Sequence, residues 1–285
     1  MAAFPSLTIE GVRIPRVICG TNALLGWSHV SPGRDAWIRE YFTAERIALV
    51  FAKCIELGVT AVMGPLYPRL IEALDATEKL TGVRMTWVAT TNAGRAPAGR
   101  EQDLAQARAA GKRDEALAIS LESTSEQASL LKEAGASFCL FHGQWADEWP
   151  MRGDELIDLA HFTQEIRAAG LIPGSSVHDS SRLAYLLGHD VDLALLATPV
   201  NKSGWYMLPD RDQALAAIGS KAKPVLAIKT LACGRYSDER SVPEWLNWAA
   251  AVEGVEAIAL GVMVEQEAEQ SIPVLRECFQ RKFGV

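Results

Sequence analysis

Three residues, His142, His178 and Lys229, combine reactive side chains with positions at the ends of short apolar runs. A neutral imidazole can donate or accept a proton near neutral pH, which suits both histidines to acid–base chemistry. A lysine in an apolar run either points into a pocket or is buried without a partner. Removal from water lowers the pKa of such a lysine, so that it can polarise or attack a carbonyl group. We therefore expect these three side chains to be catalytic; the alternatives are that the histidines cap loops and that Lys229 pairs with a carboxylate or a substrate anion.

Further side chains that follow apolar runs are candidates for holding a substrate. Asp179 can do so, but it can also cap the helix that begins at Ser180 or orient an imidazole. Aromatic residues at such positions form walls that suit a sugar ring or an apolar compound, or they only pack a lid. The polar candidates are Asn22, His29, Tyr67, Asp179 and Asn201, and the aromatic ones are Trp27, Trp145, Trp149, Trp205 and Tyr206.

Eight short apolar runs, separated by helical patterns, would position these side chains. Runs this apolar are typical of strands buried on both faces, as in a parallel sheet covered by helices. Eight such strand-helix units in one chain favour an α/β fold, a single (β/α)8 TIM barrel, over an open doubly wound sheet. The runs are residues 17–19, 61–63, 87–89, 138–141, 174–177, 193–197, 225–228 and 257–260.

In such a barrel, the side chains just past the C-terminal end of each strand converge on one pocket. The chain of 285 residues fits one barrel domain, residues 1–285, without remainder. Residues 23–42 follow the first strand and are rich in aromatic side chains, so we expect them to form a lid over the barrel mouth. Residues 116–122 fit either an extra strand or a helix, and we assign them to the connection after the third strand.

Composition and charge exclude several functions. The formal net charge is −7 and no Lys- or Arg-rich stretch compensates for it, so neither nucleic acid nor a membrane is an expected partner. The N-terminus lacks a basic leader, and no apolar run approaches the length that spans a bilayer. Five widely spaced cysteines are typical of reduced thiols. We expect a cytoplasmic protein whose partner is a small-molecule substrate; the oligomeric state stays open.

Four segments resemble motifs of the aldo-keto reductase superfamily, in the family's order and spacing. Residues 61–68 lie where the family has F-D-T-A-x-x-Y-G, and residues 138–142 resemble its D-L-y-l-l-H strand. Residues 225–234 are similar to v-l-A-Y-S-P-L-a-g-G, and residues 261–270 are similar to G-a-s-x-x-E-Q-l-e-e-N. The resemblance covers the chain from the second strand onward. It implies the barrel scaffold and, in the family, NADP(H)-dependent reduction of a carbonyl group.

Two of the family's four catalytic residues, Asp, Tyr, Lys and His, are replaced. The Asp position is Val62 and the Lys position falls near Thr90 and Thr91, whereas Tyr67 and His142 keep the other two. A tyrosine without its lysine has nothing to lower its pKa from about 10 toward that of a useful proton donor. The resemblance therefore implies the scaffold more strongly than the reaction.

The positions that hold the family's nicotinamide cofactor also differ. The Ser-Asn pair after strand 5 becomes Ser176 and Val177, the Gln of strand 6 becomes Ala197, and the stacking Tyr of strand 7 becomes Ile228. No Lys-Arg pair that could hold a 2′-phosphate occurs in residues 261–272. We therefore expect no cofactor, with NADP(H) as a disfavoured alternative.

These observations favour a non-redox enzyme, a lyase, isomerase or aldolase-like protein, that acts on a carbonyl- or hydroxyl-bearing substrate such as a sugar derivative. The first alternative is an NADP(H)-dependent oxidoreductase of the aldo-keto reductase type. The second is a metal-dependent hydrolase or lyase that uses His29, His142 and His178. Three histidines without spaced carboxylates are a weak metal signature, so no metal is expected. The third alternative is a barrel retained for binding alone.

Overall fold

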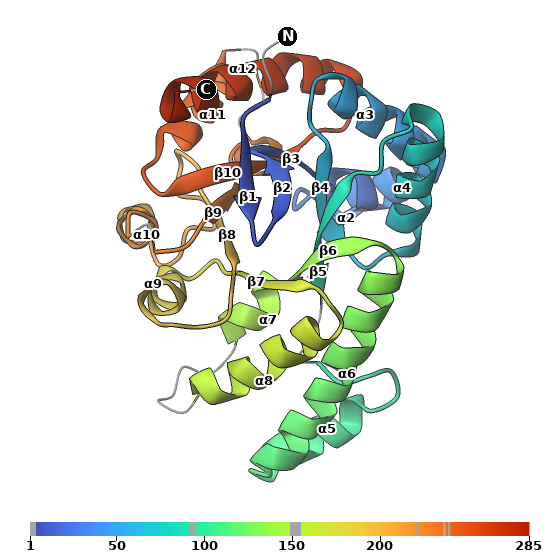
Figure 1. Ribbon diagram of the computed structural model, residues 1–285, viewed down its shortest axis with the longest axis vertical. Coiled ribbons are helices and arrows are strands. Elements are labelled where there is room, and N and C mark those ends of the chain that lie inside the picture. The colour runs from blue at the N-terminus through green and yellow to red at the C-terminus, as the bar shows by residue number, and fades with distance from the viewer. Residues whose placement is uncertain are drawn as a thin grey trace.

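The centre of the protein is a closed barrel of eight parallel strands (Figure 1). The computed structural model describes residues 4–91, 95–148, 155–220, 222–235, 238 and 240–284. In space the strands follow the order β10-β3-β4-β5-β6-β7-β8-β9. They are β3 (Val17–Gly20), β4 (Ala61–Pro65), β5 (Thr86–Thr91), β6 (Ala136–Phe141), β7 (Ile172–Ser176), β8 (Leu195–Pro199), β9 (Val225–Ile228) and β10 (Val255–Gly261). Each predicted apolar run overlaps one of these strands, so the (β/α)8 barrel is confirmed.

Strand β10 closes the barrel against β3. The two strands pair in parallel, from Ile258 opposite Val17 to Gly261 opposite Gly20. Because all eight strands are parallel, their C-terminal ends lie at one end of the barrel.

Helices follow the strands and cover the outside of the barrel, and α5 and α6 project beyond the others (Figure 1). Residues 116–122 lie within α6, so they extend a helix and form no extra strand. The helices are α1 (Asn22–Leu25), α2 (Pro32–Tyr41), α3 (Ala44–Glu56), α4 (Pro68–Thr81), α5 (Glu101–Ala109), α6 (Arg113–Glu133), α7 (Gly143–Glu148), α8 (Glu155–Ala168), α9 (Ser180–Gly188), α10 (Arg211–Ile218), α11 (Ser241–Ala251) and α12 (Glu265–Phe283), with a 3₁₀ turn at Ala232–Gly234.

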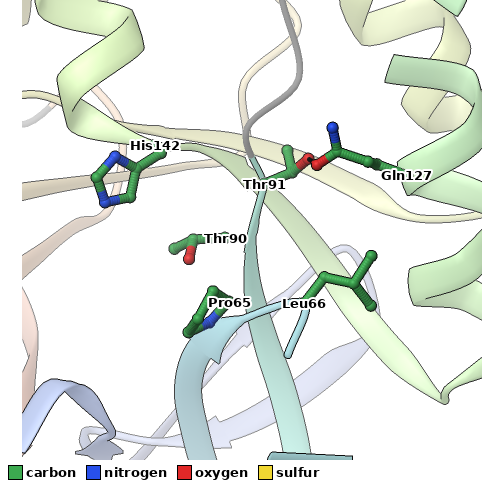
Figure 2. Close-up of a pocket in the computed structure, with 6 residues that line it drawn as sticks. All are labelled: Pro65, Leu66, Thr90, Thr91, Gln127 and His142. Carbon is green, nitrogen blue, oxygen red and sulfur yellow. Dashed lines mark hydrogen bonds between the residues drawn. The ribbon is translucent and has the colours of Figure 1, made fainter. Parts of the chain in front are cut away.

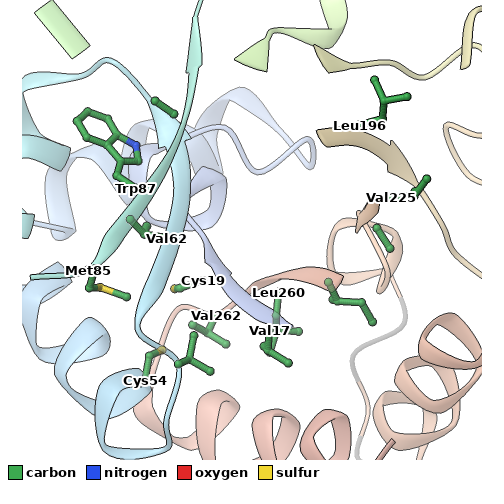
Figure 3. Packing of buried hydrophobic residues seen from close by; sticks show 14 of the residues in the cluster. Val17, Cys19, Cys54, Val62, Met85, Trp87, Leu196, Val225, Leu260 and Val262 are labelled. Carbon is green, nitrogen blue, oxygen red and sulfur yellow. The ribbon is translucent and has the colours of Figure 1, made fainter. Parts of the chain in front are cut away.

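The spacing of apolar residues in α3 explains how the helices pack on the barrel. Its buried side chains recur at intervals of three and four, which places them on one face of the helix. Figure 3 shows Cys54 of this helix close to Cys19 of β3, within one apolar cluster. The buried face comprises Ile47, Ala48, Val50, Phe51 and Cys54.

A second group of apolar side chains fills the inside of the barrel. These side chains point inward from the strands and are almost fully buried, so the barrel is a packed core and not a channel. They include Ile18, Val88, Phe138, Leu140, Leu195 and Leu226.

An antiparallel hairpin that the sequence patterns did not indicate precedes the barrel. It consists of β1 (Ser6–Ile9) and β2 (Val12–Pro15), and it lies across the barrel in Figure 1. Ile9 and Ile14 pack on the interior side chains. Because β2 leads directly into β3, the hairpin closes the N-terminal end of the barrel and leaves the other end for the site. None of the described helices combines the length and the apolarity needed to cross a membrane.

Candidate active site at the barrel mouth

A pocket of about 260 Å³ opens at the C-terminal ends of β4, β5 and β6 (Figure 2). In Figure 2 the ring of His142 lies across the pocket from Thr91 and Gln127. The Thr91 hydroxyl and the Gln127 amide oxygen are 2.6 Å apart, as donor and acceptor. The lining, which consists of Pro65, Leu66, Thr90, Thr91, Gln127 and His142, mixes apolar and polar groups and suits a small polar organic molecule.

His142 follows β6 at the exposed rim of this pocket. The backbone N–H of Gln144 donates to its Nδ1 at 3.3 Å, so the neutral ring carries its hydrogen on Nε2. Partial removal of the imidazole from water, together with the positive charges of His178 and Lys229, lowers the pKa of His142 to about 4. At neutral pH, His142 therefore presents an uncharged Nε2–H donor that can bind and polarise a carbonyl oxygen.

His178 lies just after β7 and is paired with Asp147 of α7. Its Nδ1 is 2.7 Å from Asp147 Oδ2, and its backbone N–H donates to Oδ1 at 2.8 Å. Burial alone would raise the pKa of Asp147, but hydrogen bonds from the side chain and backbone of His178 lower it below the usual value. Because an ionised carboxylate only accepts, Nδ1 carries the hydrogen of the imidazole. The other ring nitrogen, Nε2, is buried and has no hydrogen-bond partner in the described part of the structure.

Lys229 follows β9 in a left-handed backbone conformation, with φ of 56°. Its Nζ lies 5.4 Å from the centre of the Tyr206 ring. Burial lowers the pKa of Lys229, and the nearby Cys233 and Asp147 offset only part of that effect. Within the residues that the structure describes, this ammonium group makes no salt bridge, so its charge is available to a ligand.

The predicted catalytic side chains share one electrostatic environment. The charges of His178 and Lys229 lower the pKa of both His142 and His29, in addition to the larger effect of burial. The structure therefore places these groups at the same end of the barrel. Of the three predicted catalytic residues, only His142 lines the pocket of Figure 2. Across the described ranges, no three His, Cys, Asp or Glu side chains are placed to hold a metal ion.

The segment between α1 and α2 contacts two other loops at the mouth. The ring centres of Trp27 and Tyr67 are 5.4 Å apart. The ring of His29 lies 6.1 Å from that of Trp205 and 6.0 Å from that of Tyr206. These contacts join the loop after β3 to the loops after β4 and β8.

Two of the polar candidates bind neighbouring backbone. Asp179 Oδ1 accepts the N–H of Ser181 at 2.8 Å, so Asp179 caps α9. Asn201 accepts the backbone N–H of Trp205 at 2.9 Å and donates to its carbonyl oxygen at 2.8 Å. Asn201 thus stabilises the loop after β8.

The remaining candidates differ in exposure. Asn22 is exposed at the start of α1, directly beyond β3. Trp145 of α7 packs against Phe141 of β6 and Phe162 of α8, with ring centres 5.2 and 5.4 Å away. Trp149 lies outside the described residues.

Asp147 is the site residue that the sequence patterns missed. It lies in a helix, whereas the predicted candidates follow strand ends. One signal was available: Gly143 and Asp147 are four residues apart and so share a face of α7. A side chain on Gly143 would overlap the His178 ring, so this face is the one turned to His178.

Comparisons with known proteins identify the fold. No family model matches the chain, and no curated protein matches its sequence. An aldo/keto reductase from Brucella melitensis matches 95% of this chain and 93% of its own, with 13% identity and a TM-score of 0.59. An aldo/keto reductase from Klebsiella pneumoniae, solved with NADP and acetate, matches 99% of this chain and 96% of its own, with 13% identity and a TM-score of 0.56. A candidate aldo-keto reductase from Pseudomonas aeruginosa matches 96% and 95%, with 15% identity and a TM-score of 0.62.

These matches confirm the resemblance for the fold and correct two expectations. The expected non-redox lyase, isomerase or aldolase-like function is wrong, because the structural neighbours are reductases and fit the oxidoreductase alternative better. The expectation that no cofactor is needed is also contradicted, because a neighbour that covers almost the whole chain was solved with NADP.

Proposed function

We propose that this protein is an NADP(H)-dependent oxidoreductase that reduces the carbonyl group of a small organic molecule or oxidises the corresponding alcohol. The observation that carries the proposal is the pocket at the ends of β4, β5 and β6, with the Nε2–H of His142 at its rim. His142 stands where the aldo-keto reductases have their catalytic histidine. A donor at this position would hold the carbonyl oxygen and draw electron density from the carbonyl carbon.

Three cations at the mouth fit the diphosphate of a dinucleotide. Lys229 and Arg235 follow β9, and Arg34 of α2 reaches the loop after β10, where its guanidinium lies 3.5 Å from Met263 Sδ. Arg235 lies over the Trp205 ring at 4.2 Å. None of the three forms a salt bridge with a described residue. Uncompensated positive charge on neighbouring loops is what an anionic cofactor requires.

The nicotinamide ring of the bound cofactor would contact different residues from those that hold it in aldo-keto reductases. Ile228 offers an apolar contact where the family has an aromatic platform, and Ser176 keeps one hydroxyl of the Ser-Asn pair. That hydroxyl makes no hydrogen bond with another described residue, so it is free to bind a carboxamide. Bound NADPH would supply the hydride that a carbonyl carbon takes up.

Residues 23–42 would then serve as the lid over the bound molecules. Trp27 and His29 contact Tyr67 and Trp205 on other loops, which supports this placement. Closure of this lid would exclude water from the reacting groups. We also place the activity in the cytoplasm, since the five cysteines are free thiols and suit a reducing compartment.

Titration of the purified protein with NADPH and NADH, followed through its tryptophan fluorescence, tests the proposal. Arg235→Ala should weaken NADPH binding about tenfold, as expected for the loss of one charge-assisted contact. Arg13→Ala is the matched control, because Arg13 lies on the hairpin at the closed end of the barrel and should not affect binding. A panel of aldehydes and ketones then identifies the substrate through NADPH consumption. If neither nucleotide binds at millimolar concentration, the proposal fails.

A further inference from the structure

The imidazole of His178 is oriented by one carboxylate and left free at its second nitrogen. Asp147 accepts from both the ring Nδ1 and the backbone N–H, at 2.7 and 2.8 Å, and it also accepts the N–H of Asp179 at 3.3 Å. The hydrogen bond from Nδ1 orients the ring and keeps the hydrogen on Nδ1, and the two backbone N–H groups hold the carboxylate in place. Nε2 is therefore the nitrogen that can exchange a proton.

In a histidine with a purely structural role, both ring nitrogens would have hydrogen-bond partners. His178 is only 9% exposed, and its Nε2 is one of two buried side-chain nitrogen or oxygen atoms without a hydrogen-bond partner in the described chain. Leaving a buried polar atom unpaired costs about 1–3 kcal/mol. A ligand that reaches Nε2 would remove this penalty, which is the pattern of a functional site.

Charged and aromatic groups from five parts of the fold surround the ring. Asp147 supplies the negative charge from α7, and Lys229 supplies a positive charge from the loop after β9. His142 and His29 feel the charge of His178, so they also lie within electrostatic reach. The edge of the Tyr206 ring lies against the imidazole, with ring centres 5.2 Å apart.

The proposed reduction needs a proton donor. The tyrosine that serves as the donor in aldo-keto reductases lacks its lysine partner here. Tyr67 stands at the family's tyrosine position, but Thr90 and Thr91 occupy the region of the lysine that would acidify it. His142 is neutral above about pH 4, so it can donate a hydrogen bond but holds no imidazolium proton at neutral pH. Gly143 joins the two histidines, because it follows His142 and lies against the ring of His178.

We propose that His178 exchanges the proton with the substrate oxygen through Nε2, and that Asp147 is its positioning residue. This inference rests on the proposed oxidoreductase function. In reduction, the carbonyl carbon would take up a hydride from NADPH, which leaves NADP⁺, and form a C–H bond, and the π electron pair of the carbonyl group would move to oxygen. The Nε2–H bond of the His178 imidazolium breaks and its proton joins that oxygen to give the alcohol. Asp147 stays ionised throughout, and the neutral imidazole takes up a proton from solvent before the next turnover. In oxidation, neutral His178 accepts the alcohol proton.

Variants of the two residues separate binding from proton transfer. His178→Gln should lower kcat by about 10²–10⁴-fold while the NADPH dissociation constant changes less than about twofold. Asp147→Asn should lower kcat with little effect on KM, because the ring loses its orientation. Added imidazole should restore part of the activity of His178→Gly. His189→Gln is the matched control, since His189 is exposed at the end of α9 and should leave all constants unchanged.

A spectroscopic measurement tests the pair without turnover. NMR of histidine labelled with nitrogen-15 should show the Nδ1–H tautomer for His178 in the wild type and its loss in Asp147→Asn. An Nε2–H tautomer in the wild type would overturn the proposal. So would NADPH-dependent turnover that survives His178→Gln but is abolished by Tyr67→Phe, and in that case the oxidoreductase function would stand. A failure of the wild type to bind either nucleotide would overturn both proposals.

Discussion

The carboxylate of Asp147 accepts two hydrogen bonds from His178, one from the backbone N–H at 2.8 Å and one from the ring Nδ1 at 2.7 Å. This double contact joins the last turn of α7, which follows β6, to the segment just after β7. The position of His178 relative to α7 therefore depends on one carboxylate.

We predict that Asp147→Ala lowers the free energy of unfolding by about 2–3 kcal/mol at neutral pH, because it leaves buried donors of His178 without an acceptor. The pKa of Asp147 is below its usual value of 3.8 in the folded state. Its contribution is therefore present above that value and is lost as pH falls through the folded pKa. Denaturant unfolding at several pH values measures this. The difference between the wild type and the variant should shrink below pH 3.8.

Asp212→Ala is the control for this series. The side chain of Asp212 is 85% exposed, so its loss should change the free energy of unfolding by less than about 0.5 kcal/mol. A loss at Asp147 no larger than that at Asp212 would contradict the structural role assigned to the carboxylate.

Gly143→Ala should separate His178 from Asp147. A Cβ at residue 143 would overlap Cε1 of His178 and lie 2.7 Å from its Nδ1, so the imidazole must move. We expect a loss of about 1–3 kcal/mol in the free energy of unfolding, together with loss of the Nδ1–H signal of His178. Gly188→Ala is the matched control, since a Cβ there meets nothing within 4 Å. Equal effects of the two substitutions would show that residue 143 does not press on the imidazole.

His142 should make the protein less stable as the pH falls. Its pKa is about 4 in the folded state against an ordinary value of 6.5, so the unfolded chain binds its proton first. Between these two values the free energy of unfolding decreases as pH falls, and the effect is complete below the folded pKa. His142→Gln removes this contribution, so the pH dependence between 4 and 6.5 should become shallower than in the wild type. Parallel curves for the two proteins would contradict the lowered pKa.

The barrel could be predicted from sequence because its strands are buried on both faces and are therefore apolar throughout. Periodicity in α3 and similar segments supplied the helices between them. The hairpin of β1 and β2 could not be predicted in this way, because its strands expose part of their side chains and so include polar residues. Residues 116–122 were ambiguous, since their short apolar pattern fits either a strand or the middle of α6.

The candidate site could be predicted only where strand ends determine it. That rule selected His142, His178 and Lys229, which the structure places at one end of the barrel. It did not select Asp147, because the pairing of this residue with His178 depends on how α7 packs. Locally, Asp179 is the more obvious partner, yet its carboxylate caps α9.

The error about function has a similar cause. The replaced motif residues pointed away from a nicotinamide, but cofactor binding also depends on charge spread over several loops. Arg34 and Arg235 are 201 residues apart in the chain, yet both lie around the same mouth. No local motif could show that arrangement.

Removal of the Tyr206 side chain should open the way to His178. The aromatic ring lies 5.2 Å from the imidazole, edge-on, and the Tyr206 backbone has a left-handed φ of 62°. Glycine adopts this conformation without strain, so Tyr206→Gly should remove the ring and leave the loop in place. We predict that diethyl pyrocarbonate, which modifies unprotonated imidazole nitrogens, reacts faster with His178 in this variant than in the wild type.

Peptide mass mapping after timed exposure to the reagent measures this rate at each histidine. His189 is the internal reference, because it is exposed and contacts Tyr185 and not Tyr206. Its Nδ1 lies 2.7 Å from the Tyr185 carbonyl oxygen. The rate at His178 relative to His189 should rise in Tyr206→Gly and fall again when NADPH and a substrate analogue occupy the mouth. An unchanged ratio would mean that a different group shields Nε2, and access for the substrate would then have to come from movement elsewhere at the mouth.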